Sequence, residues 1–327
     1  MTIRHLVVGF LILLFAVNLA LNLFVTVRVE VRLQATTEPA SEGEQVVSLE
    51  EYLRRRSPDG RFIAYYADPS WEAAADEALT YLTTADRLLQ GLGFSLGRFG
   101  VVLLPYPSGA SKVVLERRGW DALRQILGID PLLFPLVMPP QVRSLAKAPT
   151  AVRLWLHWAG LHEWVEGTIA KRLYFRDRRT RWVGDGLAEY LAYRITQALD
   201  PEIACEGWNQ QRIRLRLGRE QGWKTYNLIE DFPVRRGQPG DLNARDLEQG
   251  VKEQIGYGIA FVFWHRVAQR YGEDTIRRFW EELRRQSSPT AEDAARILQS
   301  LTGEEVWTYL QGVPLEEALR LLEDSPC

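Results

Sequence analysis

His162-Glu163-Trp164-Val165-Glu166 is the stretch that decides the fold of this chain, together with a second stretch that contains Asp185. Asp185 follows after eighteen intervening residues, within Trp182-Val183-Gly184-Asp185-Gly186-Leu187-Ala188-Glu189-Tyr190. Residues four apart lie on one face of an α-helix, so His162 and Glu166 can reach a common point, while Glu163 is turned to the flank. Asp185 would arrive from the next helix. A metal-activated water requires this layout, with ligands from two helices and a neighbouring carboxylate that accepts a proton.

Glu189 lies one turn beyond Asp185 on the same helix face. A carboxylate there can hydrogen-bond a metal ligand and fix its orientation. A His and a carboxylate four residues apart also occur on ordinary exposed helices. The gap to Asp185 and the surrounding Trp, Gly and Ala-Glu-Tyr residues distinguish this pattern from such a face.

The composition narrows the class of protein. The chain has 327 residues and a formal net charge of −2, with both signs spread along it, which argues against nucleic acid as the main partner. Its two cysteines, Cys205 and Cys327, could pair, and the sequence leaves this open. They form no disulfide framework, and no CxxC motif indicates a structural zinc or a redox site.

Residues 1–33 are expected to form an N-terminal transmembrane anchor. The stretch from Leu6 to Val27 carries no charge, and its 22 residues can cross a bilayer as a helix. No small-residue cleavage site of a secretory signal follows it. The flanking charges are nearly balanced. We nevertheless expect a single-pass membrane protein with an extracytoplasmic C-terminal domain, because the short N-terminal tail is a poor candidate for translocation. Residues 34–47 are polar and indicate a linker.

Residues 48–313 are predicted to form one α+β domain. Ser48 opens a short helix, residues 61–66 form a strand, residues 70–92 a long amphipathic helix, and residues 99–105 and 112–115 two further strands. The apolar, proline-containing stretch 127–140 is expected to be a buried or lid-like loop.

From residue 150 the chain is predicted to be mainly helical. The expected helices cover residues 151–173, 182–198, 257–271, 274–286, 291–301 and 304–310. The Gly- and Asp-rich stretch 218–249 is expected to be an irregular, cleft-lining loop. Residues 314–327 would form a C-terminal helix and tail.

These motifs resemble the gluzincin metallopeptidases, in particular membrane-associated bacterial members with a peptidase MA-like domain. That family shows HExxH, eighteen residues and then Glu within W-x-x-E-G-x-A-E-Y, which is similar to residues 182–190 here. Residues 61–66 with the following helix look like the family's opening strand and helix. Tyr257-Gly258-Ile259-Ala260-Phe261 and Arg270-Tyr271-Gly272 look like its Y-G-x-x-F…R-Y-G helix. The resemblance covers roughly residues 48–312 and implies a zincin-like fold.

The resemblance also implies roles for individual residues. His162 would be a zinc ligand, Glu163 the general base and polariser, and Tyr257 a donor to the tetrahedral oxyanion. The second and third ligand positions fall on Glu166 and Asp185, where the family has His and Glu.

These two departures change the expected chemistry. One His and two carboxylates neutralise Zn²⁺, so the pKa of its water would be lowered less than by the family's two histidines and one carboxylate. Asp185 is one methylene shorter than Glu, about 1.5 Å of reach. Either the two helices lie closer together than usual or Asp185 does not bind the ion directly.

The oxygen-rich ligand set does not identify which metal ion would bind. It would suit Mn²⁺ or Mg²⁺ better than the family's site does, and a site without metal is a further alternative. Without a cation, the crowded carboxylates would require a basic partner. The candidates are Arg153, Lys171, Arg179 and Arg181.

Other residues receive plainer interpretations. His157 is expected to be a packing or surface residue, and a replacement ligand is the minor interpretation of His265. The tryptophans at 155, 158 and 164 are predicted to face the core or the sheet. The basic stretch 176–181 is expected to be a solvated loop, with contact to anionic lipid headgroups as an alternative.

Three functions fit this sequence. The first is a membrane-anchored metallopeptidase that hydrolyses peptide bonds by metal-activated water, with Glu163 as base. The second is a catalytically inactive pseudopeptidase that binds a peptide or protein partner through the same cleft. The third is a membrane-tethered structural scaffold.

Overall fold

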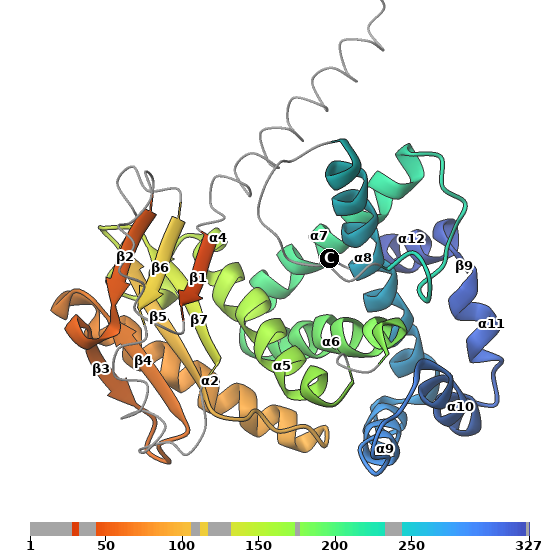
Figure 1. The fold of residues 1–327 in the computed structure, drawn as a ribbon, viewed down its shortest axis with the longest axis horizontal. Helices are drawn as coiled ribbons and strands as arrows, with labels where there is room; N and C mark the ends of the chain where they lie inside the picture. Colours follow the sequence, from red (N-terminus) through yellow and green to blue (C-terminus); the bar gives the residue numbers. More distant parts are fainter. Residues whose placement is uncertain are drawn as a thin grey trace, which may run out of the picture.

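The computed structural model describes residues 28–32, 44–105, 112–116, 132–173, 177–232, 244–324 and 327. The predicted α+β class is confirmed: most strands gather on one side of the molecule and most helices on the other, with α5 (Leu161–Leu173) and α6 (Arg181–Leu199) between them (Figure 1). The predicted membrane span lies outside the described residues. Within those residues, no helix has both the length and the apolar character needed to cross a membrane.

A four-stranded sheet forms one wall of the domain. Its strand order is β3 (Leu53–Arg56), β4 (Phe62–Tyr66), β5 (Phe99–Pro105) and β7 (Leu132–Met138). Strands β4, β5 and β7 are parallel and β3 is antiparallel. β4 is completely buried and β5 nearly so, because α2 (Glu72–Gly91) packs against β4 with its row of alanines and leucines. The predicted strands and long helix at these positions are confirmed.

Strand β7 corrects the prediction of a loop at residues 127–140. Pro135 lies in the middle of this strand, where its missing N–H would break a central ladder. β7 is an edge strand, however, and the Pro135 carbonyl accepts a hydrogen bond from the Trp155 indole at 2.9 Å, which indicates that it points to the open edge of the sheet. The N and C=O of one residue point to the same side of a strand, so the imino nitrogen also faces away from β5.

A second sheet contains three parallel strands that the sequence did not indicate in full. β6 (Lys112–Glu116), the predicted strand, lies between β1 (Arg28–Arg32) and β2 (Glu44–Ser48). β1 falls in the segment assigned to the anchor, and β2 falls in the segment assigned to the linker. The helix expected after Ser48 is one turn of 3₁₀-helix, Leu49–Glu51.

The helical part follows the prediction except around residues 200–256. The remaining helical elements are α4 (Thr150–Leu154), a π-helical segment (Trp155–Gly160), the 3₁₀-helices Pro69–Trp71, Leu145–Lys147 and Arg178–Thr180, α9 (Glu273–Leu283), α10 (Ala291–Thr302), α11 (Val306–Gln311) and α12 (Leu315–Glu323). Between residues 200 and 256, helix α7 (Pro201–Glu220) was not predicted. The stretch 218–249, which was expected to be a loop, contains the end of α7, strand β8 (Thr225–Tyr226) and the start of α8 (Ala244–Tyr271). β8 pairs with β9 (Val313–Pro314).

Helix α6 is the centre of the helical core. It packs against α5, α7 and α8, and nearly every residue from Arg181 to Thr196 is buried. Gly186 permits the close approach of α8, because a Cβ there would lie 2.8 Å from the Trp264 ring. Gly207 does the same for α7, since its Cβ would lie 2.0 Å from the Trp158 ring. These contacts bring the side chains of four helices to one place.

Cys205 and Cys327 form a disulfide that ties the last residue of the chain to α7. The sequence left this pairing open. Arg212 of α7 adds hydrogen bonds to the carbonyls of Leu322 and Cys327, and the Trp208 indole also donates to Leu322. The C-terminal helix is therefore fastened to α7 by covalent and polar contacts.

His265 belongs to an aromatic cluster and lies outside the group formed by His162, Glu166 and Asp185. Its ring centroid lies 4.9 Å from that of Trp208 and 6.0 Å from that of Phe261. Burial, helped by the charge of Arg194, lowers the pKa of His265 to about 4. His157 is also a packing residue, stacked on Tyr81 with ring centroids 4.2 Å apart and lying 3.2 Å from Asp200.

We expect the His265→Phe variant to lose less stability in acid than the wild type. His265 stays neutral in the fold but is protonated in the unfolded chain, so its stabilising contribution is complete above pH 6.5 and is lost as the pH falls toward 4. The loss would reach about 3 kcal/mol near pH 4. Urea titrations across this range measure it, and parallel stability curves for the two proteins would contradict the expectation.

Candidate metal centre

The π-helical segment Trp155–Gly160 directly precedes the helix that carries His162 and Glu166. A π-turn holds one more residue than an α-turn and so changes the direction in which the following side chains point. Trp164 anchors the same helix: it is fully buried, with its ring 5.6 Å from Phe134 of β7. With Trp164 facing the sheet, His162 and Glu166 face α6.

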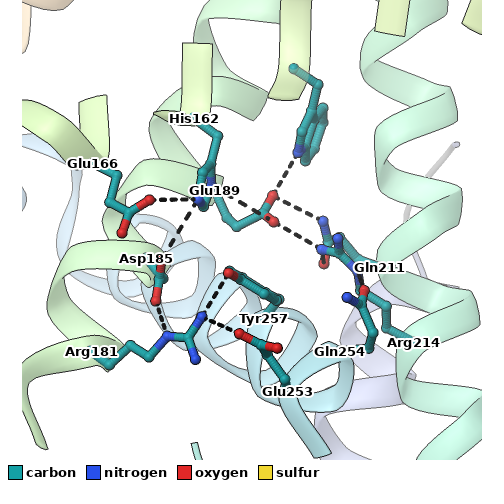
Figure 2. A network of polar contacts seen from close by, with 11 residues as sticks. His162, Glu166, Arg181, Asp185, Glu189, Gln211, Arg214, Glu253, Gln254 and Tyr257 are labelled. Atoms are coloured by element: carbon teal, nitrogen blue, oxygen red, sulfur yellow. Dashed lines mark hydrogen bonds and ion pairs between the residues drawn. The ribbon is translucent and has the colours of Figure 1, made fainter. Parts of the chain in front are cut away.

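His162, Glu166 and Asp185 converge, as Figure 2 shows. The His162 Nε2 atom lies 3.5 Å from Glu166 Oε2 and 3.7 Å from Asp185 Oδ1, and one ligand atom from each residue lies within 4.8 Å of the others. Two ligands about 2.1 Å from one ion at a tetrahedral angle stand about 3.4 Å apart. The side chain of Asp185 is therefore long enough to share an ion with His162.

The buried atoms of this group fit a divalent cation. Asp185 Oδ1 is buried and has no hydrogen-bond partner among the described residues, although it faces the imidazole. Burying a carboxylate oxygen without a partner is costly, and a cation would satisfy it. Burial alone would lower the pKa of His162, but the carboxylates of Asp185, Glu166 and Glu189 outweigh it and raise that pKa well above its usual value. The imidazole therefore lies where positive charge is strongly favoured.

Glu189 is the centre of a second set of contacts behind His162. Its carboxylate accepts hydrogen bonds from the Trp158 indole at 2.6 Å, the Gln211 amide at 3.1 Å and the Arg214 guanidinium at 2.9 Å. Its Oε1 atom lies 3.8 Å from His162 Nδ1, which is longer than a hydrogen bond. Glu189 is thus held beside the imidazole by residues of α7 and by Trp158.

Glu163 lies on the flank of α5 and does not belong to the converging group. Its side chain is exposed to solvent on one side, but the surrounding protein removes enough water to raise its pKa to about 7. The charge of His162 opposes this shift, whereas Glu166, Asp185 and Glu189 add to it. The charges of the site therefore influence the pKa of Glu163, and this pKa lies near neutral pH, as that of a general base must.

Arg181 corrects the prediction of a solvated basic loop. It is buried at the start of α6, one turn before Asp185, and its Nε atom donates a hydrogen bond to Asp185 Oδ2. Its Nη2 atom donates to Glu253 Oε1 and to the Tyr257 hydroxyl oxygen, both at 2.7 Å. The other basic candidates described by the structure lie elsewhere: Arg153 pairs with Asp200 and Glu202, and Arg179 pairs with Asp177 and Glu292.

Tyr257 of α8 lies edge-on to His162, with ring centroids 5.7 Å apart. Its hydroxyl is turned toward Arg181 and Asp185 (Figure 2). Because the hydroxyl oxygen accepts from Arg181, the phenolic proton is directed to another acceptor. Burial first and the charge of Asp185 second raise the pKa of Tyr257 well above its usual value, although Arg181 opposes them, so Tyr257 remains a neutral donor.

Sequence reasoning missed Glu253, Arg214 and Gln211. Glu253 precedes Tyr257 by four residues on α8, so helical spacing from the tyrosine could have found it. Arg214 and Gln211 come from α7, the helix that was not predicted. The site contains four carboxylates, those of Glu166, Asp185, Glu189 and Glu253; Arg181 contacts Asp185 and Glu253, Arg214 contacts Glu189, and Glu166 contacts His162. A protonated His162 would leave one negative charge, whereas an ion bound to the neutral imidazole would find two, which one divalent cation would balance.

No protein-family model matches this chain, and no curated protein matches it either.

Proposed function

We propose that this protein is a divalent-metal-dependent peptidase of zincin-like fold, with His162, Glu166 and Asp185 as ligands. The observation that carries the proposal is the convergence of these three side chains from two helices, at separations that suit one shared ion. The excess of carboxylates over guanidinium groups at the site supports a dication over a neutral occupant. Zn²⁺ is the first candidate, and the oxygen-rich set also suits Mn²⁺.

The surrounding residues have separate roles in hydrolysis. A divalent ion bound there would supply a polarising charge for a peptide carbonyl and would lower the pKa of water. Glu163 would accept a proton from the attacking water at its carboxylate and pass it to the leaving amine. Tyr257 would donate its phenolic proton in a hydrogen bond to the carbonyl oxygen as negative charge develops. Glu189, held by Trp158, Gln211 and Arg214, would place a negative charge beside His162 Nδ1 and favour its orientation toward the ion.

A second candidate is a pseudopeptidase that binds a peptide or a partner protein without cleaving it. One observation favours it: a protonated His162 between Glu166 and Asp185, with Arg181 on the other oxygen of Asp185, would satisfy most of the site's charges without an ion. The two candidates differ in metal content. A structural scaffold would require neither a metal nor a bound peptide.

We also propose that the domain works outside the cytoplasm, attached to the membrane by the apolar stretch Leu6 to Val27. The disulfide between Cys205 and Cys327 supports this location, because such bonds persist in oxidising compartments and are rare in the cytosol. This location is tested by alkylating the free thiols of the protein after isolation from cells under conditions that stop thiol–disulfide exchange. Free thiols in that material would contradict the extracytoplasmic assignment.

Metal analysis of the purified full-length protein is the first test of the function. After chelation and reconstitution with Zn²⁺ or Mn²⁺, we expect one ion per chain and an increase in unfolding free energy of about 2.7 kcal/mol at a free-ion concentration one hundred times the Kd. His162→Ala should abolish both effects, whereas His157→Ala, which alters a histidine outside the site, should not. A protein that binds no ion would contradict the proposal.

Peptide cleavage then separates the peptidase from the pseudopeptidase. A quenched-fluorescent peptide library incubated with the reconstituted wild type should be cleaved, and chelation should stop the cleavage. Stoichiometric metal with no cleavage of any peptide would favour the binding protein. A protein that binds neither a metal ion nor a peptide would favour the structural scaffold.

A further inference from the structure

We infer that Arg181 is a positioning residue that joins the ligand Asp185 to the hydrogen-bond donor Tyr257 in one buried unit braced by Glu253. The inference rests on the proposed function, since it assigns to Arg181 the task of aiming a ligand and a donor at the same ion and substrate. Arg181 itself would touch neither. Its position in the site follows from three hydrogen bonds made by a single planar group.

The guanidinium determines which oxygen of Asp185 is available to an ion. Nε of Arg181 occupies Oδ2, and this leaves Oδ1 directed toward His162 Nε2 at 3.7 Å. Asp185 is completely buried, so bulk solvent does not reach this contact. The carboxylate is thereby limited to binding through one oxygen, and its side-chain rotation is fixed before any ion arrives.

The same guanidinium sets the position of Tyr257. Nη2 binds the hydroxyl oxygen at 2.7 Å, so the phenolic proton points away from Arg181. The ring of Phe232 lies 4.4 Å from the guanidinium carbon and packs edge-on against Tyr257, with ring centroids 5.3 Å apart. Arg181 is thus held from a third side by a cation–π contact.

Glu253 holds the other end of the brace. It is buried on α8, one turn before Tyr257, and accepts from the same Nη2 atom at 2.7 Å. A planar guanidinium can direct several donors at fixed angles, whereas an ammonium group is a point charge on a flexible stem. Lysine at position 181 could therefore keep the charge but not the simultaneous contacts with Asp185, Glu253 and Tyr257.

The test measures metal affinity and coordination in variants of Arg181. Arg181→Gln should weaken Zn²⁺ binding by about 10- to 100-fold, the usual loss when a residue that orients a ligand is removed. Arg181→Lys should weaken it by an intermediate factor. The matched control is Arg179→Gln, which alters an arginine two residues away that pairs with Asp177 and Glu292, and it should leave the affinity unchanged.

Co²⁺ reconstitution provides a readout that lost packing alone would not change. The visible absorption of bound Co²⁺ depends on the number and geometry of its ligands. We expect Arg181→Gln and Arg181→Lys to alter this spectrum and Arg179→Gln to reproduce that of the wild type. Circular dichroism identifies the variants that fold. If Arg181→Gln does not fold, Glu253→Gln keeps the guanidinium, weakens its brace by removing the negative charge of residue 253, and should show a smaller change in the same direction.

The outcomes separate this inference from the proposed function. A wild-type protein that binds no Zn²⁺ or Co²⁺ overturns the proposed function and the role of Arg181 with it. A wild type that binds the ion, with unchanged affinity and an unchanged Co²⁺ spectrum in the folded variants, overturns the role of Arg181 alone.

Discussion

Replacing Glu163 with Gln is expected to lower kcat/KM for peptide cleavage by about 10²- to 10⁴-fold, the usual contribution of a general base. Gln has nearly the shape of Glu but cannot accept a proton. Glu163 lies on the flank of α5, outside the group formed by His162, Glu166 and Asp185. The variant should therefore keep its metal, and the loss should appear in kcat more than in KM.

Two further measurements make this prediction specific to Glu163. Glu206→Gln changes an exposed glutamate of α7 in the same way and should leave both activity and metal content unaltered. Metal content of the Glu163→Gln protein must be determined beside its activity, because a loss of the ion would give the same rate. Full activity in a metal-loaded Glu163→Gln protein would show that another group accepts the proton.

Removing the disulfide is expected to cause the largest loss of stability. The Cys205→Ala, Cys327→Ala double variant should unfold with a free energy about 2–5 kcal/mol lower than that of the wild type. The two cysteines are 122 positions apart, so the bond restricts more than a third of the unfolded chain. It also holds α12 against α7 beside the hydrogen bonds that Trp208 and Arg212 make to the C-terminal residues.

Urea unfolding under non-reducing conditions measures this difference. A reducing agent should lower the wild-type midpoint to that of the double variant and should leave the double variant where it is, which separates the disulfide from the altered side chains. Equal midpoints for the oxidised wild type and the double variant would contradict the prediction. Because α7 also carries Gln211 and Arg214, we expect the reduced protein to bind Zn²⁺ more weakly.

Local patterning accounts for what was predicted correctly. The buried strands β4 and β5 and the long helix α2 show their apolar periods within their own residues, so no distant contact was needed to recognise them. Convergence of His162 and Glu166 also follows from a local rule, since residues four apart on a helix share a face. The α+β class follows from the order of such elements along the chain.

One element was predicted wrongly, one was missed and one residue was misplaced, because their neighbours in space decide them. Strand β7 contains a proline, and only its edge position lets that residue stand in a strand. Helix α7 begins with good signals, an Asp200 cap and Pro201, but its glycines and many charged residues weaken the apolar period. Arg181 was predicted to lie in a solvated loop and was also one of four candidate partners for the carboxylates; the structure buries it against Asp185, Glu253 and Tyr257.

The amino-acid sequence by itself determined the helices that carry His162, Glu166, Asp185 and Glu189, because helical spacing is a property of neighbouring residues. Only the tertiary structure decided that Asp185 reaches His162, that Arg181 and Arg214 enter the site, and that Cys205 pairs with Cys327. Those outcomes depend on how closely whole helices pack, and close packing is set by contacts such as those of Gly186 and Gly207 with aromatic rings of distant segments.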